Sequence, residues 1–165
     1  MFYLNTLFYS LIHGFSKREQ EKYNFYLENR GLVDNWDMVD LAARNIIGAH
    51  IAEFTTHKNI SDTLIASPSV WDKRTAVMSS HPLLMNGDMG YAFSVVERLI
   101  SSKEELVQSS LGWVLKESYK QDPAATENFI KSHFESLSNQ AIRIGTERME
   151  KNYRKAFMRG EFVTA

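Results

Sequence analysis

The chain has 165 residues, 44% of them hydrophobic and 24% charged, a composition and length that suit one folded domain over residues 1–165 and argue against wholesale disorder. It contains no cysteine, which excludes a disulfide framework, a thiolate metal site and a cysteine nucleophile. Its 19 basic and 20 acidic side chains give a formal net charge of −1, which is unusual for a nucleic-acid-binding protein.

The most apolar stretch, residues 1–15, opens the chain. Asn5, Thr6, Ser10 and His13 interrupt it, so it falls short of the roughly 20 apolar residues that span a bilayer. It also lacks the basic region and cleavage site of a signal peptide. We therefore expect an amphipathic first helix that packs on the domain, and no contact with a membrane. An exposed apolar patch on this helix would indicate a dimer.

Strong helical periodicity follows in several segments. In residues 104–120, Val107, Leu111, Val114 and Leu115 form one apolar stripe with a spacing that alternating strands cannot produce. The same type of pattern predicts further helices over residues 17–29, 124–135, 138–149 and 150–159. Typical helix-start residues are Asp34 before Trp36, Ser67 before Pro68 and Asp122 before Pro123.

No convincing run of strands interrupts these helices, and about eight or nine helices joined by short turns account for the chain. Consecutive helices with short connections pack as antiparallel pairs. Stacked pairs form an α-solenoid, whose concave face is built from alternate helices. The sequence thus predicts an all-α protein, with a solenoid favoured and a globular helix bundle as the alternative.

Asp40 and Arg74 stand out from the apolar positions around them. Asp40 lies four residues after Trp36 and therefore shares its helical face. If Asp40 has only a structural role, it caps a neighbouring helix or pairs with an arginine. Arg74 has only apolar neighbours one turn away on either side, and burying a guanidinium requires a matching anion. That anion is either Asp40 or the phosphate of a ligand.

Trp113 lies off the apolar stripe of its helix and shares a face with Ser109, Lys116 and Lys120. A tryptophan beside two lysines is typical of an exposed surface that contacts nucleic acid or a protein partner.

The charged residues are also unevenly distributed along the chain. Residues 139–159 carry six basic and two acidic side chains, whereas residues 1–40 carry four basic and six acidic ones. A near-neutral chain can thus still present one basic face.

Other common sites lack support in the sequence. The five histidines have no metal-ligand spacing, and no phosphate-binding loop, dinucleotide fingerprint or nucleophile elbow is present.

Four segments together resemble a known family, the DNA alkylation repair glycosylases (AlkD-like, with HEAT-like repeats). Residues 35–41 (NWDMVDL) with 46–48 (IIG) resemble its NWDLVDxxxxxIVG segment, and residues 70–77 (VWDKRTAV) its LWxxRxA element. Residues 111–117 (LGWVLKE) are similar to its GWxLRE element, and residues 139–143 (NQAIR) match its xxAxR turn more loosely. The order and rough spacing of the four segments agree with the family over residues 17–155.

The resemblance implies a curved HEAT-like solenoid that binds duplex DNA in a basic concave groove. It implies a DNA glycosylase that hydrolyses the N-glycosidic bond of cationic alkylated purines such as 3-methyladenine and 7-methylguanine. It further implies a cytoplasmic base-excision-repair protein, nucleoid-associated if bacterial, that needs no metal and no cofactor. The alternatives are a non-catalytic solenoid that binds DNA and a protein-interaction scaffold.

By the same resemblance, Asp40 supplies the catalytic carboxylate, and Trp36 and Trp113 face the sugar-phosphate of the lesion. Arg74 would hold a phosphate near the lesion, and Lys73, Lys116, Lys120 and Arg143 would contact the DNA backbone. Two departures from the family stand out. Lys116 replaces its usual arginine, which keeps the charge but loses the bidentate geometry. The chain also begins about one helix before the matching segment, so we expect at least one N-terminal helix pair of the family to be missing.

Overall fold

The computed structural model describes residues 19–54 and 58–162, and this part of the chain is helical with no strand, which confirms the all-α prediction. The elements are α2 (Glu19–Asn29), η1 (Arg30–Leu32), α3 (Trp36–Ala42), η2 (Ala43–Gly48), α4 (Ala49–Glu53), α5 (Lys58–Ala66), α6 (Val70–Ser79), α7 (His81–Met85), α8 (Met89–Leu99), α9 (Glu105–Gln121), α10 (Pro123–Ser132), α11 (Asn139–Gly145) and α12 (Lys151–Phe157).

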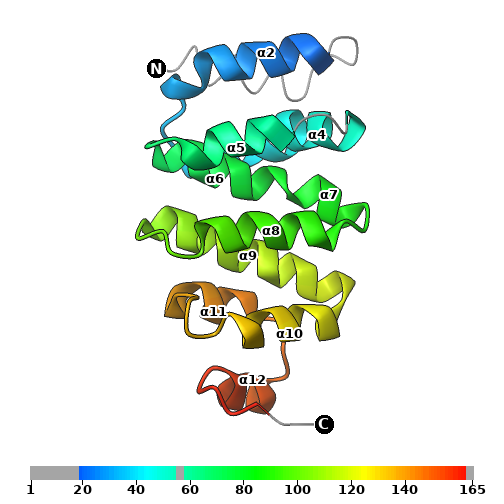
Figure 1. Cartoon of the computed structure of the whole chain (residues 1–165), viewed down its shortest axis with the longest axis vertical. Coiled ribbons are helices and arrows are strands. Elements are labelled where there is room, and N and C mark those ends of the chain that lie inside the picture. The colour runs from blue at the N-terminus through cyan, green and yellow to red at the C-terminus, as the bar shows by residue number, and fades with distance from the viewer. Residues whose placement is uncertain (1–18, 55–57, 163–165) are drawn as a thin grey trace.

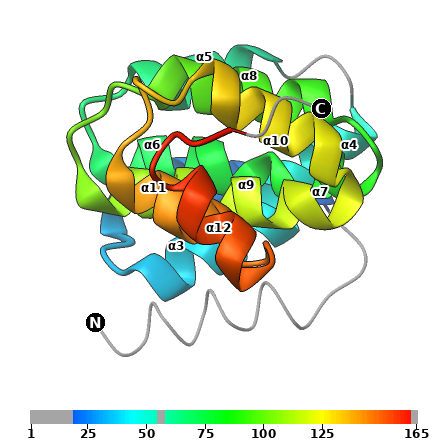
Figure 2. The ribbon, with the colours of Figure 1, turned by 90° about the horizontal axis from the view of Figure 1, so that it is seen from below.

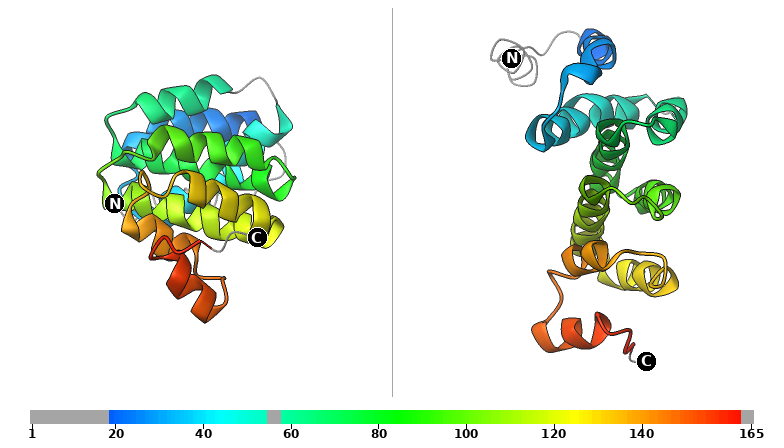
Figure 3. Two further views of the ribbon diagram at one scale, coloured as in Figure 1. Left: turned by 60° about the horizontal axis from the view of Figure 1, so that its bottom comes forward. Right: turned by 90° about the vertical axis from the view of Figure 1, so that its left-hand side faces the viewer.

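The helices stack in two layers along the long axis of the molecule (Figure 1). Helices α5, α8 and α10 form one layer, and α6, α9 and α11 form the other (Figure 3, right). Helices α3 and α12 project from the far side of the second layer, near its opposite ends, as the view from below also shows (Figure 2). The α6–α9–α11 layer therefore lies on the inner side of a short solenoid.

Side-chain caps explain where several helices begin. Asp122 accepts a hydrogen bond from the N–H of Ala125 and starts α10, as predicted. The other two predicted start residues are wrong by one or two positions. Asn35 rather than Asp34 caps α3, and Ser69 rather than Ser67 caps α6. In each case the capping residue is the one whose side chain accepts from the N–H three residues further on.

The segment 138–149, predicted as one helix, is helical only from Asn139 to Gly145. The Thr146 hydroxyl donates to the carbonyl of Ile142, and a tight turn then carries the chain to α12. Side chains that bond their own backbone in this way compete with helix continuation. The residues 1–15, on which the predicted first helix and its dimer surface depend, lie outside the described residues.

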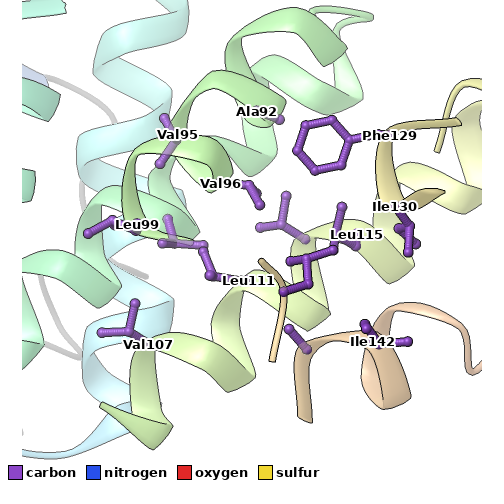
Figure 4. Packing of buried hydrophobic residues seen from close by; sticks show 14 of the residues in the cluster. Ala92, Val95, Val96, Leu99, Val107, Leu111, Leu115, Phe129, Ile130 and Ile142 are labelled. Atoms are coloured by element: carbon purple, nitrogen blue, oxygen red, sulfur yellow. The ribbon is translucent and has the colours of Figure 1, made fainter. Parts of the chain in front are cut away.

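Two apolar clusters hold the layers together. One joins α2, α3, η2 and α4 around Tyr26, Val39 and Ile47. The other lies between α8, α9, α10 and α11, where Val96, Leu111, Leu115, Phe129 and Ile142 converge (Figure 4). Leu111 and Leu115 belong to the predicted stripe of α9 and are fully buried. The stripe thus faces the core and leaves the opposite side of α9 to the inner surface of the solenoid.

Gly112 sets the spacing between α9 and α11. A Cβ at this position would lie 2.7 Å from Cβ of Ile144 and 2.8 Å from the carbonyl oxygen of Ala141. Because one of these atoms belongs to the backbone, the two helices would have to separate. We expect Gly112→Ala to lower the free energy of unfolding by about 1–3 kcal/mol, measured by urea denaturation.

A matched glycine provides the control. Gly90 lies in α8, and a Cβ there would meet only the Asp88 side chain, at 3.7 Å. Gly90→Ala should leave stability unchanged or raise it by up to about 1 kcal/mol, because alanine is the better helix former. Equal effects of the two substitutions would contradict the close approach at Gly112.

Among the described residues, no helix is both long enough and apolar enough to cross a membrane.

Candidate nucleic-acid groove

A groove of about 650 Å³ lies on the inner side of the solenoid. It is lined by side chains from α3, η2, α6, α9 and α11 and from the turn after α11: Trp36, Asp37, Asp40, Leu41, Arg44, Arg74, Met78, Ser109, Trp113, Lys116, Arg143, Ile144 and Glu147. The groove brings together the four residues predicted to act at the lesion, Trp36, Asp40, Arg74 and Trp113, and it adds Lys116 and Arg143 of the four predicted DNA-binding residues. Lys73 and Lys120 are not among the side chains that line it.

Asp40 and Arg74 form a bidentate ion pair in this groove. Nε of Arg74 donates to Oδ1 of Asp40, and Nη2 donates to Oδ2, both at 2.7 Å. Only 9% of Asp40 and 7% of Arg74 is exposed. The anion that the apolar surroundings of Arg74 require is therefore Asp40, the first of the two alternatives considered from the sequence.

Arg74 also connects α6 to α9. Its Nη1 donates to the carbonyl of Leu106 at 2.5 Å and to the hydroxyl of Ser109 at 3.0 Å. Four of its five N–H donors are thus satisfied within the protein. Arg74, which lies on α6, consequently links α3 to α9 and fixes the orientation of the Asp40 carboxylate.

Trp113 is half-buried, and the sequence-based expectation of an exposed ring is wrong in this respect. Its ring lies 5.0 Å from the ring of His81 between centroids, and the guanidinium carbon of Arg44 lies 5.4 Å from its centroid. Burial lowers the pKa of His81, and the positive charge of Arg44 lowers it further. The imidazole of His81 and the guanidinium of Arg44 thus both pack against the indole of Trp113.

Trp36 has the opposite character, because 55% of it is exposed. It is the first residue of α3, directly after the capping residue Asn35. The cap fixes where the helix starts and hence where the indole stands at the edge of the groove. The groove therefore combines one freely accessible tryptophan with one that is held rigidly.

The predicted DNA-binding residues fall into two groups. Arg143 is exposed in the groove, and no carboxylate within residues 19–54 and 58–162 pairs with it. Lys116 also lines the groove, where its ammonium lies 3.2 Å from a carboxylate oxygen of Glu147. Both cations are accessible from the groove, although Lys116 would have to share its charge with Glu147.

The second group is engaged elsewhere. Lys73 donates to Glu104 at 2.8 Å, and this hydrogen bond, with another from Ser102, lowers the pKa of Glu104 to about 2. Lys120 pairs with Glu117 on its own helix. Each of these lysines has a carboxylate partner outside the groove, so neither adds a free positive charge to it.

Reasoning from the sequence missed Arg44 and His81, which hold Trp113, and Ser109 as a partner of Arg74. Arg44 carries a signal that could have identified it, because it follows Trp36 and Asp40 at the same four-residue spacing. His81 carries none, since it meets Trp113 only through the packing of α7 on α9.

Several basic side chains of the C-terminal stretch 139–159 already have partners within the protein. Arg154 donates to the carbonyl of Arg143 and to Thr146, Arg159 pairs with Glu161, and Arg148 lies 3.8 Å from Glu117. Within the described ranges, Arg143, Lys151 and Lys155 of this stretch have no carboxylate partner. Arg143 alone of these three lines the groove.

Fold and groove together define an α-helical solenoid with a polar inner groove that holds a carboxylate, guanidinium groups and indoles. A family model described as DNA alkylation repair enzyme matches residues 8–149, so the chain belongs to that family. This membership confirms the resemblance stated from the sequence. Among curated proteins, no sequence matches the chain.

A solved structure described as a predicted DNA alkylation repair enzyme from Enterococcus faecalis has the same fold. The two superpose with a TM-score of 0.68 at 22% sequence identity. The match covers 88% of this chain and 66% of the other, so the present chain spans a little under two thirds of that protein.

Proposed function

We propose that the protein is a DNA glycosylase that removes cationic alkylated purines, such as 3-methyladenine and 7-methylguanine, from duplex DNA. The observation that carries the proposal is the carboxylate of Asp40, which Arg74 holds in a groove that also presents Trp36 and Trp113. Membership of the DNA alkylation repair enzyme family supports DNA as the substrate.

The chemistry of such a substrate suits this groove. An alkylated purine already carries a positive charge, so it leaves without a general acid, and the sugar becomes cationic as the bond breaks. A fixed carboxylate stabilises that charge and orients the attacking water. The two Arg74 hydrogen bonds use two of the roughly four lone-pair sites of Asp40, which leaves acceptor capacity for water.

Indole faces would complete the site. An aromatic face attracts a nearby cation, by about 0.5–2 kcal/mol depending on solvent exclusion. Trp113 is held in place by His81 and Arg44, and Trp36 is exposed at the edge of the groove. We propose that both faces approach the sugar of the lesion, and that Arg143 and Lys116 contact backbone phosphates without selecting a sequence.

Arg74 takes a different role from the one that the resemblance implied. Its N–H donors are largely satisfied by Asp40, Leu106 and Ser109, so it has little capacity left for a phosphate. We propose that Arg74 positions the Asp40 carboxylate and does not contact DNA itself.

The direct test is incubation of the protein with a duplex that contains a single 7-methylguanine, followed by alkaline cleavage at abasic sites. The proposal predicts strand cleavage at the lesion with no added metal or cofactor. Cleavage no greater than that given by the Asp40→Asn variant would refute it.

One observation favours a second candidate, a solenoid that binds duplex DNA without cutting it. Arg74 neutralises the Asp40 carboxylate through both oxygens, which weakens the field that would stabilise a cationic sugar. This candidate predicts salt-dependent duplex binding, no base release, and an Asp40→Ala variant that binds duplex as well as the wild type or better.

A further inference from the structure

Arg44 lies at a widened turn between α3 and α4. The segment η2 is π-helical, and the N–H of Ala49 donates to the carbonyl of Arg44, five residues earlier. Single π-helical turns inside longer helices are frequent at functional sites. This turn lies one helical turn after Asp40, on the helix that supplies both Trp36 and Asp40 to the groove.

The side chain of Arg44 is anchored at two points. Its Nε donates to the carbonyl oxygen of Asp40 at 3.1 Å, and its guanidinium carbon lies 5.4 Å from the ring centroid of Trp113. Both Nη atoms remain, and in the described part of the chain no carboxylate pairs with them. Arg44 therefore presents up to four N–H donors to the groove with little remaining freedom of its own.

Among the described residues that line the groove, Arg44 combines an anchored side chain with a charge that no carboxylate neutralises, and it lies four residues after Asp40. Arg74 is neutralised by Asp40, and Lys116 is paired with Glu147. Arg143 has no carboxylate partner among the described residues, and within them no hydrogen bond anchors its side chain. Asp37 also lines the groove, and it forms no ion pair with Arg44.

We propose that Arg44 binds a DNA backbone phosphate beside Asp40 while its guanidinium plane supports the ring of Trp113. A planar guanidinium can contact an indole through its face and a phosphate through its edge at the same time. The inference rests on the proposed function for its partner, duplex DNA, and does not depend on base release.

The test is the salt dependence of binding to a fluorescein-labelled duplex of unmodified DNA. Each phosphate contact contributes about 0.9 to the slope of log K against log [salt]. Arg44→Met retains an apolar contact with Trp113 and removes the charge, so we expect the magnitude of the slope to fall by about 0.9. That change corresponds to about eightfold weaker binding at 0.1 M salt relative to the 1 M reference.

Two further variants separate charge from packing. Arg44→Lys keeps the charge and should keep the slope, whereas its indole contact is weaker. Arg98→Met is the matched control, because Arg98 pairs with Asp62 and lies outside the groove; its slope should equal that of the wild type. Circular dichroism melts would establish that all variants are folded at the assay temperature.

The outcomes distinguish this inference from the proposed function. A slope that Arg44→Met leaves unchanged overturns the phosphate contact, even if the variant alters Trp113 fluorescence or base release. A slope that falls as expected in a protein with no base release supports the contact and refutes the glycosylase. Absence of duplex binding by the wild-type protein at low salt overturns both.

Discussion

Asp40→Asn is expected to reduce base release from a 7-methylguanine duplex by about 100- to 1000-fold, the usual cost of removing one preorganised electrostatic group. The substitution keeps the shape of the side chain but removes the negative charge that would face the sugar cation. The measurement is the single-turnover rate of abasic-site formation with enzyme in excess, so that product release does not limit it.

A loss of activity through unfolding must be separated from a loss of chemistry, and Asp72 offers the matched control. Asp72 is a buried carboxylate on α6 that pairs with Arg30 at 3.2 Å and accepts from Ser67, but it does not line the groove. Asp72→Asn should lower stability by an amount similar to Asp40→Asn and leave the rate of base release within about threefold of wild type.

Duplex binding gives a second readout for the same variant. Removing a negative charge from the groove reduces repulsion of the DNA phosphates, so Asp40→Asn should bind undamaged duplex as well as the wild type or better. If Asp40→Asn retains full single-turnover activity, the catalytic role of Asp40 is contradicted. If Asp40→Asn loses duplex binding and activity together, Asp40 has a structural role only.

The fold follows largely from local patterns, whereas the partners within the groove depend on tertiary contacts. The apolar stripe of α9 predicted that Leu111 and Leu115 are buried, because residues three or four apart lie on the same face of a helix. A helix start is not determined by residue type where two capping residues lie close together, as with Ser67 and Ser69. The cap is then decided by which side chain reaches the free N–H, which the residue type alone does not determine.

Charge pairs over long sequence separations show the same limit. The apolar surroundings of Arg74 predicted that it needs an anion, but Asp40 and a phosphate satisfied that requirement equally well. Lys73 and Glu104 lie 31 residues apart, and only the packing of α6 on α9 brings them together. Four motif residues nevertheless meet in one groove, because the helices that carry them, α3, α6 and α9, pack side by side.

The ion pair of Arg74 and Asp40 should be the polar interaction on which stability depends most. Arg74→Met leaves the Asp40 carboxylate buried without its counter-ion, and breaking such a pair from one side costs about 3–5 kcal/mol. It also leaves the carbonyl of Leu106 without this donor and loosens α3 from α9. The measurement is the free energy of unfolding in urea at pH 7, with the m-value checked for a change in the unfolded state.

A double-mutant cycle with Asp40→Asn isolates the pairwise part of this cost. In the double variant no uncompensated charge remains buried, so it should be less destabilised than the sum of the single variants by about 1–3 kcal/mol. The exposed pair of Arg98 and Asp62 is the reference, because Arg98→Met should cost no more than about 1 kcal/mol. Strict additivity at Asp40 and Arg74 would mean that the two side chains contribute independently, and Arg74 could then not be the residue that positions the carboxylate.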